Sequence, residues 1–415
     1  MKISYTGKKI NPDYPVDLSG FGYFLNRVTD FVQEDLFAHA LNISHEGTQL
    51  LIITCDLLGL SSYIVDRVKT AISGKHNICK NQIIMLPTHT HTAPVVIPLI
   101  GCGQLDYAYQ SFLISALVDV AEESFENTSE VVAIRRLVCP VSGVGYNRTI
   151  SDGPIDNNVY GLVFETKNSG TYAIVNYACH PVTFGSRSVI SADFPHYVLK
   201  NLEEKGIKGI YINGCHGDID PIERDADSNK NAAEYGARIA QSFFNGLKSA
   251  VQVDISLEVF DFDFNISLQK IDLNELPDIV LQMNEAAEGN DSMKVAVFQW
   301  EQVLTNQILK GTITCEENVY NQAVRIGDCV LLASQGELYT EIGQRVRKNI
   351  DPEFLIFGSN ANVATRYIAP DSELKDKTYG GFTSNIVDGT VPVCAGTMEE
   401  FIDNITTHLL SRRSS

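Results

Sequence analysis

Two histidines separated by one residue give the first sign of chemistry in this sequence. His89 and His91 lie in the segment Thr88-His89-Thr90-His91-Thr92-Ala93-Pro94, directly after the apolar run 83–86. The run predicts a buried strand, and Pro94 prevents a helix from starting straight after it. Residues two apart in an extended chain point to the same side, so both imidazoles would face one cavity. Small flanking threonines suit a metal site, although two hydrogen-bonded loop histidines would give the same pattern.

Polar residues follow four other apolar runs in the same way. They are His180, the segment from His216 to Asp220, Glu337, and the loop from Asn362 to Tyr367. In open α/β sheets the functional crevice lies outside the carboxyl ends of the strands, so we expect these groups to converge. Two histidines and one glutamate form a set that binds zinc and leaves a position open for water. A cation there lowers the pKa of bound water and polarises a carbonyl, which favours hydrolysis.

Each of these residues also has a simpler explanation. His180, followed by proline, would suit a capped strand end. Glu337 would suit the first turn of the helix that we expect to begin at 336–337 and to run through Val346, because the helix dipole favours an acid there. The pair 217–218 is also ordinary turn chemistry. The acidic run 223–227 is interpreted as a solvated loop and not as a calcium site.

Strands and helices follow one another along most of the chain, and they must position these residues. The sequence predicts an α/β fold with a mixed central β-sheet flanked by helices, built as a single catalytic domain over residues 1–415. Two helices near 274–310 would form a helical insertion. The segment 251–268 alternates between apolar and polar residues, and a slip of phase between Val259 and Phe260 predicts a bulge or a break there. Other predicted strands cover 49–55, 83–86, 131–138, 160–165, 172–179, 209–212, 320–325, 329–333 and 354–357.

Composition excludes several classes of function. The chain has 415 residues, of which 44% are hydrophobic and 20% charged, as expected for a globular protein with a sizeable core. The formal charge of −19 argues against binding to nucleic acid or to anionic membranes.

No apolar stretch approaches the about 20 residues that span a bilayer, and the amino terminus lacks the apolar core of a signal peptide. The nine scattered cysteines contain no CxxC pair, so we expect free thiols in a cytoplasmic protein without a membrane anchor.

The order of the motifs resembles the catalytic domain of the neutral/alkaline (non-lysosomal) ceramidases and their bacterial relatives. The resemblance covers nearly the whole chain, and it is specific because five separated motifs occur in the same order. The motifs are Thr88 to Pro94, Cys179-His180-Pro181, Gly217-Asp218-Ile219-Asp220-Pro221, Gly336-Glu337 and Asn362 to Tyr367. Gly20-Phe21-Gly22, Asp56, Asn147-Arg148 and Tyr379-Gly380-Gly381 are similar to that family as well.

The resemblance implies a zinc site and roles for particular residues. That family holds one zinc with two histidines, a glutamate and a tyrosine, which match His89, His180, Glu337 and Tyr367. Arg148 matches the arginine that faces the substrate. His91 matches the second histidine of the Thr-His-Thr-His motif, which is placed to act on the zinc-bound water or on the oxyanion.

Two departures from the family bear on the substrate. Ceramidases carry a serine, taken as essential, where this chain has Asp220. Secreted ceramidases also have a leader and a carboxy-terminal β-sandwich domain, and we expect neither here. We therefore expect a zinc-dependent amidohydrolase that cleaves a linear amide, or a related ester, of a small polar N-acyl substrate, with His91, Asp220 and Arg148 as catalytic residues. Two alternatives stay open, namely a true neutral ceramidase acting on N-acylsphingosine and a non-catalytic zinc-dependent binding protein.

Overall fold

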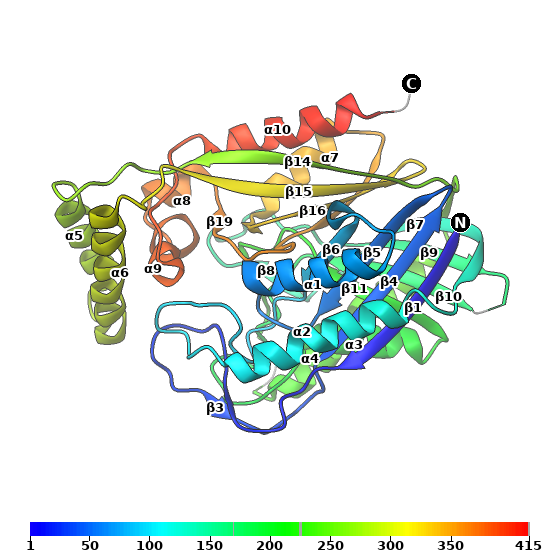
Figure 1. Cartoon of the computed structure of the whole chain (residues 1–415), viewed down its shortest axis with the longest axis horizontal. Helices are drawn as coiled ribbons and strands as arrows, with labels where there is room; N and C mark the ends of the chain where they lie inside the picture. Colours follow the sequence, from blue (N-terminus) through cyan, green and yellow to red (C-terminus); the bar gives the residue numbers. More distant parts are fainter. Residues whose placement is uncertain (169, 224–225, 414–415) are drawn as a thin grey trace.

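Two β-sheets pack face to face and helices cover their outer sides (Figure 1). The computed structural model describes residues 1–168, 170–223 and 226–413. The larger, nine-stranded sheet has the order β11-β10-β9-β7-β1-β4-β5-β6, and β13 pairs with β7. Both parallel and antiparallel pairs occur in it, so the predicted mixed sheet flanked by helices is confirmed. Its strands are β1 (Lys2–Lys9), β4 (Phe37–His45), β5 (Thr48–Cys55), β6 (Ile83–Pro87), β7 (Ser129–Pro140), β9 (Asn158–Thr166), β10 (Thr171–Tyr177), β11 (Ile207–Asn213) and β13 (Val251–Val253).

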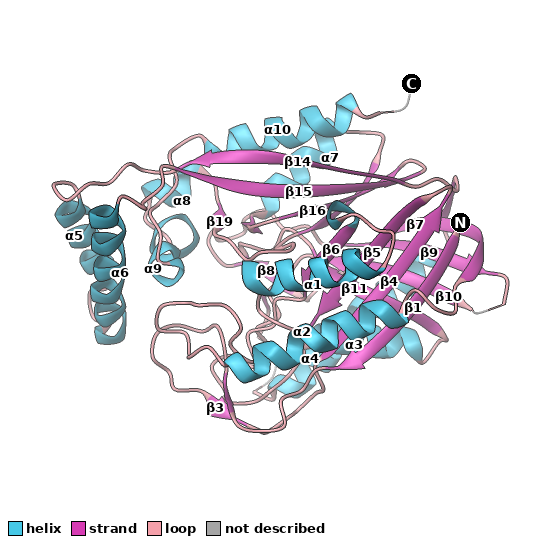
Figure 2. Ribbon diagram, in the orientation of Figure 1, coloured by secondary structure: helices cyan, strands magenta, loops and turns pink. Residues whose placement is uncertain are grey.

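A second sheet of four strands lies against the first, which adds a layer to the predicted fold (Figure 2). Its order is β14-β15-β16-β18. Alternate residues of both sheets meet in one apolar core, because side chains along a strand point to opposite faces. Ile52 and Ile84 of the larger sheet share this core with Leu331 and Ile356 of the smaller one. The strands of the smaller sheet are β14 (Glu258–Ser267), β15 (Glu316–Ile326), β16 (Cys329–Ser334) and β18 (Phe354–Gly358).

Three strand–helix–strand units supply the parallel pairs of these sheets. The units are β5-α1-β6, β10-α3-β11 and β16-α7-β18. Each helix packs back on its sheet with one apolar face, and Ser61 and Asp193 cap the first turns of α1 and α3 through side-chain hydrogen bonds. The connecting helices are α1 (Ser62–Lys75), α3 (Phe194–Glu203) and α7 (Thr340–Asn349). The carboxyl ends of these six strands can therefore position side chains in the loops that follow them.

The remaining long helices complete the outer layers. Helix α2 shares an apolar cluster with α1 and with β4 and β5, and α4 does so with α3 and with β9 and β10. Helix α10 packs with α7 on the outer side of the smaller sheet. These helices are α2 (Tyr107–Glu123), α4 (Ser228–Leu247) and α10 (Thr397–Ser411).

Helices α5 (Leu276–Ala286) and α6 (Asp291–Lys310) occupy the predicted insertion and stand at the left edge of Figure 1. They belong to the same apolar cluster as the smaller sheet. Trp300 of α6 is fully buried there, and its indole N–H donates to the carbonyl of Thr390 at 2.7 Å. The insertion is therefore attached to the body of the protein through a buried contact.

Two local predictions were wrong. Glu337 does not begin a helix: it lies in the two-residue strand β17 (Glu337–Leu338), which pairs in parallel with β19 (Tyr367–Ile368), and α7 starts at Thr340. The break in the alternating segment is not between Val259 and Phe260, which are both in β14. It covers residues 254–257, between β13 and β14, where the chain passes from the larger sheet to the smaller one.

Short elements fill the connections between the layers. They are β2 (Val16–Asp17), β3 (Val28–Thr29), β8 (Gly145–Asn147), β12 (Ile219–Pro221), α8 (Asp371–Lys375), α9 (Ser384–Asp388), the 3₁₀ turn Lys80–Gln82 and the π-helical turn Tyr379–Thr383. All nine cysteines lie within the described ranges and none forms a disulfide. No helix in the described part of the chain combines the length and apolar character needed to cross a membrane.

Candidate metal centre

Four side chains meet where parallel strands of both sheets end. His89 follows β6, His180 follows β10, His216 follows β11, and Glu337 follows β16 by three residues. One ligand atom from each lies within 4.8 Å of all the others. The three histidines are buried and Glu337 is nearly so, with 15% of its side chain exposed. The two sheets thus bring together residues that are up to 248 positions apart in the sequence (337 − 89).

Backbone carbonyls fix the same tautomer in all three histidines. Nδ1 of His89 lies 2.7 Å from the carbonyl oxygen of Leu58, and Nδ1 of His216 lies 2.8 Å from that of Gly214. His180 makes the equivalent contact with Ile219 at 3.0 Å. A carbonyl oxygen only accepts, so each Nδ1 carries the hydrogen and each Nε2 keeps its lone pair, which in His216 lies 3.5 Å from the side-chain amide of Asn360. Metal-binding histidines are held in this way by a partner of their second nitrogen.

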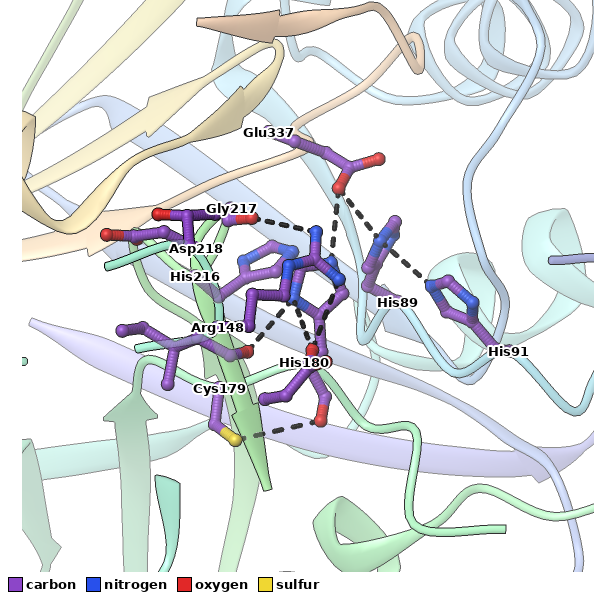
Figure 3. A network of polar contacts seen from close by, with 12 residues as sticks. His89, His91, Arg148, Cys179, His180, His216, Gly217, Asp218 and Glu337 are labelled. Carbon is purple, nitrogen blue, oxygen red and sulfur yellow. Dashed lines mark hydrogen bonds and ion pairs between the residues drawn. The ribbon is translucent and has the colours of Figure 1, made fainter. Parts of the chain in front are cut away.

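Glu337 lies between two of these Nε2 atoms, as Figure 3 shows. Its Oε2 is 3.3 Å from Nε2 of His89 and 3.2 Å from Nε2 of His180. Burial raises the pKa of the Glu337 carboxyl, but the neighbouring His89 and His180 outweigh it and hold that pKa well below its usual range. Burial lowers the pKa of His180 and of His216, which favours the neutral imidazoles that bind metals. Three imidazole nitrogens and one carboxylate oxygen therefore fit a divalent metal ion such as zinc.

Arg148 joins the centre to the strand pair β8–β12. Its guanidinium donates to the carbonyl of Gly217 at 2.9 Å and to the hydroxyl of Tyr367 at 3.1 Å, and it forms an ion pair with Asp220 at 3.2 Å. Asp220 also lies 3.7 Å from Nδ1 of His180. Burial disfavours the charged guanidinium, yet Tyr367, Asp220 and Glu337 together raise the pKa of Arg148 above its usual value. The arginine is therefore a fixed positive charge beside the cluster.

Tyr367 lies next to Glu337 because β17 and β19 pair these two residues directly. Its hydroxyl accepts the hydrogen bond from Arg148, and the side chain lines the same cavity as Glu337. Burial raises the pKa of the Tyr367 hydroxyl far above 10, and the nearby Glu337 adds to this effect. Its role as a metal ligand stays a prediction.

His91 lies at the edge of the four-residue cluster. Its Nε2 is 3.3 Å from Nε2 of His89, and its ring packs edge-on against Phe21, with ring centroids 5.0 Å apart. Nδ1 of His91 has no hydrogen-bond partner within the described ranges. Gly20, with φ of +81°, leaves the space for this ring, since a Cβ there would lie 2.4 Å from Nδ1. His91 therefore directs its Nε2 toward the centre, while its Nδ1 is buried against Gly20.

A cavity of about 340 Å³ opens against the cluster. His89, His91, Glu337 and Tyr367 line one part of it. Apolar side chains form much of the remaining wall, among them Leu58, Leu60, Ile97, Leu99 and Val363. Its volume is in the range of small-molecule sites. A second cavity of about 450 Å³ adjoins Asp220 and shares Phe21 with the first.

The sequence prediction brought together most of this centre but missed one residue. His89, His180 and Glu337 are adjacent as expected, whereas His216 was expected to converge with them but was not among the predicted ligands. The signal for it was present, since His216 follows β11 and β11 pairs in parallel with the strand before His180. Asp218, in the same loop, instead supports the site: its carboxylate accepts from the backbone and hydroxyl of Thr340 and from the amide of Asn147, each at 2.8 Å.

Comparison with known proteins gives a likeness of fold. No protein-family model and no curated protein matches the sequence. Among solved structures, neutral ceramidase from Pseudomonas aeruginosa matches with a TM-score of 0.78 at 15% identity, covering 100% of this chain and 75% of that one. A ceramidase complexed with C2 matches with a TM-score of 0.77 at 14% identity, covering 100% and 76%.

These matches confirm the resemblance at the level of the fold. The architecture is that of the neutral ceramidase structures, and it extends over the whole of this chain. At such low identity the likeness carries the fold alone, so the activity must be argued from the residues of the centre.

Proposed function

We propose that this protein is a zinc-dependent amidohydrolase that cleaves a linear amide bond of a small polar N-acyl substrate. The observation that carries the proposal is the buried group His89, His180, His216 and Glu337 at the wall of a cavity. When bound there, zinc would lower the pKa of a water molecule and polarise the scissile carbonyl. The fold shared with the ceramidase structures supports hydrolysis of an amide.

The neighbouring side chains have the chemistry that this reaction needs. His91 lines the cavity and directs its Nε2 toward the cluster, so it is placed to take a proton from the attacking water and return it to the leaving amine. Arg148 offers a fixed positive charge that would stabilise negative charge on the carbonyl oxygen. Tyr367, held by Arg148 and adjacent to Glu337, is placed to complete the ligand set.

Asp220 is proposed to act mainly through Arg148. Its carboxylate forms an ion pair with the guanidinium and lines the second cavity, not the one that His91 and Glu337 share. A carboxylate that lines this second cavity disfavours a long acyl chain in that cavity, because burying a charge against apolar groups is costly. We therefore propose a polar substrate and negligible turnover of ceramide. The protein would work in the cytoplasm on small molecules.

A neutral ceramidase is the second candidate, favoured by the shared fold. The non-catalytic binding protein is the weaker alternative, because the cavity reaches His89 and Glu337 and so leaves the cluster accessible to a substrate.

The Asp220→Asn variant separates these possibilities. We expect turnover of soluble N-acyl amines to fall by about 100-fold in this variant. The neutral side chain of asparagine can neither balance the charge of Arg148 nor relay a proton. Metal content should stay normal, since Asp220 is outside the four-residue cluster. The measurement is kcat and KM of wild type, Asp220→Asn and Asp220→Ser against ceramide and a panel of soluble N-acyl amines.

Asp263→Asn is the matched control, because it makes the same change on the exposed side of β14. Robust ceramide cleavage by the wild type would overturn the polar-substrate proposal. Unchanged turnover in Asp220→Asn would remove Asp220 from the mechanism.

A further inference from the structure

The cavity at the metal centre also has an acidic side that the proposed reaction does not use. Glu317, Arg366 and Asp388 line it together with Ser384 and Thr390. Two carboxylates and one guanidinium leave an excess of one negative charge on this side. The apolar residues Leu58, Leu60 and Ile97 line the same cavity. The space therefore combines apolar walls with an anionic group.

Arg366 cannot neutralise both carboxylates, because all its hydrogen-bond donors have partners. Nε and Nη2 donate to Glu317 at 3.0 and 2.5 Å. Nη2 also donates to the hydroxyl of Thr390, and Nη1 donates to the side chain of Asn385 and to a backbone carbonyl. A guanidinium has five N–H groups, so none is left for Asp388. Arg366 is a buried brace of the cavity wall, with 2% of its side chain exposed.

Asp388 is left without a partner. Its side chain is open to the cavity, and within the described ranges its carboxylate forms no hydrogen bond or ion pair. It also ends helix α9, where the helix dipole disfavours a negative charge. Burial raises the pKa of Asp388 to about 7, Arg366 acts against this, and Glu337 and Glu317 add to it. The Asp388 carboxylate therefore has no hydrogen-bonding partner among the described side chains and only partial charge compensation, from Arg366.

We propose that Asp388 binds a protonated primary amine of the substrate, so that the favoured amide carries an ammonium group on a short alkyl spacer. This inference rests on the proposed hydrolase function. An ammonium ion supplies the hydrogen bonds and positive charge that the carboxylate lacks, and its methylene groups fit the apolar walls. Asp388 is thereby a specificity-determining residue in the wall of the cavity that reaches the metal centre.

The test compares substrates of equal size and different charge. N-acetyl diamines with three to five methylenes are assayed beside N-acetyl alkylamines in which a methyl group replaces the ammonium. Amides with the amino group on the acyl part form a second series. Comparison of the two series shows whether the amine part or the acyl part of the substrate faces Asp388. We expect kcat/KM to favour the ammonium substrate by about ten- to 100-fold in one series, as for a charge-assisted hydrogen bond. Equal kcat/KM in both series would overturn the proposal.

The Asp388→Asn variant should lose this preference, so that kcat/KM for the ammonium substrate falls to the value for the uncharged amide of equal size. Asp278→Asn is the matched control, because Asp278 lies exposed on α5, outside the cavity, and should keep the preference. A preference that persists in Asp388→Asn would contradict the assignment of this residue.

Calorimetry with pentylammonium and with pentan-1-ol tests the inference independently of hydrolysis and of the variant's folding. We expect the wild type to bind the ammonium at least about tenfold more tightly than the alcohol. Equal affinities would overturn the inference even if the protein hydrolyses uncharged amides. Selective ammonium binding in a protein that cleaves no amide would instead support the site and reject the proposed hydrolase function.

Discussion

Glu337→Gln should empty the metal centre and abolish hydrolysis. The carboxylate lies between Nε2 of His89 and Nε2 of His180, and a neutral amide neither matches its charge nor binds zinc well. Loss of a group that merely orients a ligand costs about 10- to 100-fold in metal affinity, so loss of a ligand should cost at least about 100-fold. Elemental analysis of the purified variant and an assay against soluble N-acyl amines measure both effects.

Glu341→Gln provides the matched control for this variant. Glu341 lies in the first turn of α7, where it pairs with Arg345 at 3.3 Å on the surface, so its loss should leave metal and activity unchanged. His180→Ala should deplete the metal as Glu337→Gln does. Full metal occupancy in both ligand variants would show that the centre has been assigned wrongly.

His91→Gln should reduce kcat by a factor of about 10² to 10⁴ while the metal stays bound. His91 is outside the four-residue cluster, but it lines the cavity and its Nε2 lies 3.3 Å from Nε2 of His89. Removing a side chain that transfers protons in the transition state has an effect of this size. Glutamine is polar and similar in length, so the ring's neighbours need not move far. Steady-state kinetics combined with metal analysis separate loss of proton transfer from loss of the metal.

His45→Gln is the corresponding control, at the end of β4 and outside the cavity. If kcat of His91→Gln equals that of the wild type, proton transfer must be assigned elsewhere.

The ligands were predictable where an apolar strand ends directly in a conspicuous polar residue. His89 and His180 satisfy this condition, and the structure brings them together with Glu337. His216 satisfies it as well and was expected at the same edge, but the family resemblance assigned the ligand positions to other residues. The strand of Glu337 could not be predicted, because β17 and β19 have two residues each and so carry no pattern.

The second sheet was concealed by a different effect. Strands such as β16 are buried on both sides, so their sequences are continuous apolar runs that do not reveal which sheet they join. The central strands β1 and β4 were not predicted, since Lys8 and Lys9 in β1 and His39 and Asn42 in β4 interrupt an apolar pattern. Asp388 could not be found from sequence at all, because only the folded chain shows that Arg366 has no donor left for it.

The most direct test of the account is the metal dependence of amide hydrolysis by the wild-type protein. The purified chain should contain about one zinc ion, in keeping with a single four-residue centre. Removal of the metal with a chelator should abolish hydrolysis of a soluble N-acyl amine, and added zinc should restore it. Hydrolysis that is unchanged in the metal-free protein would contradict the central claim.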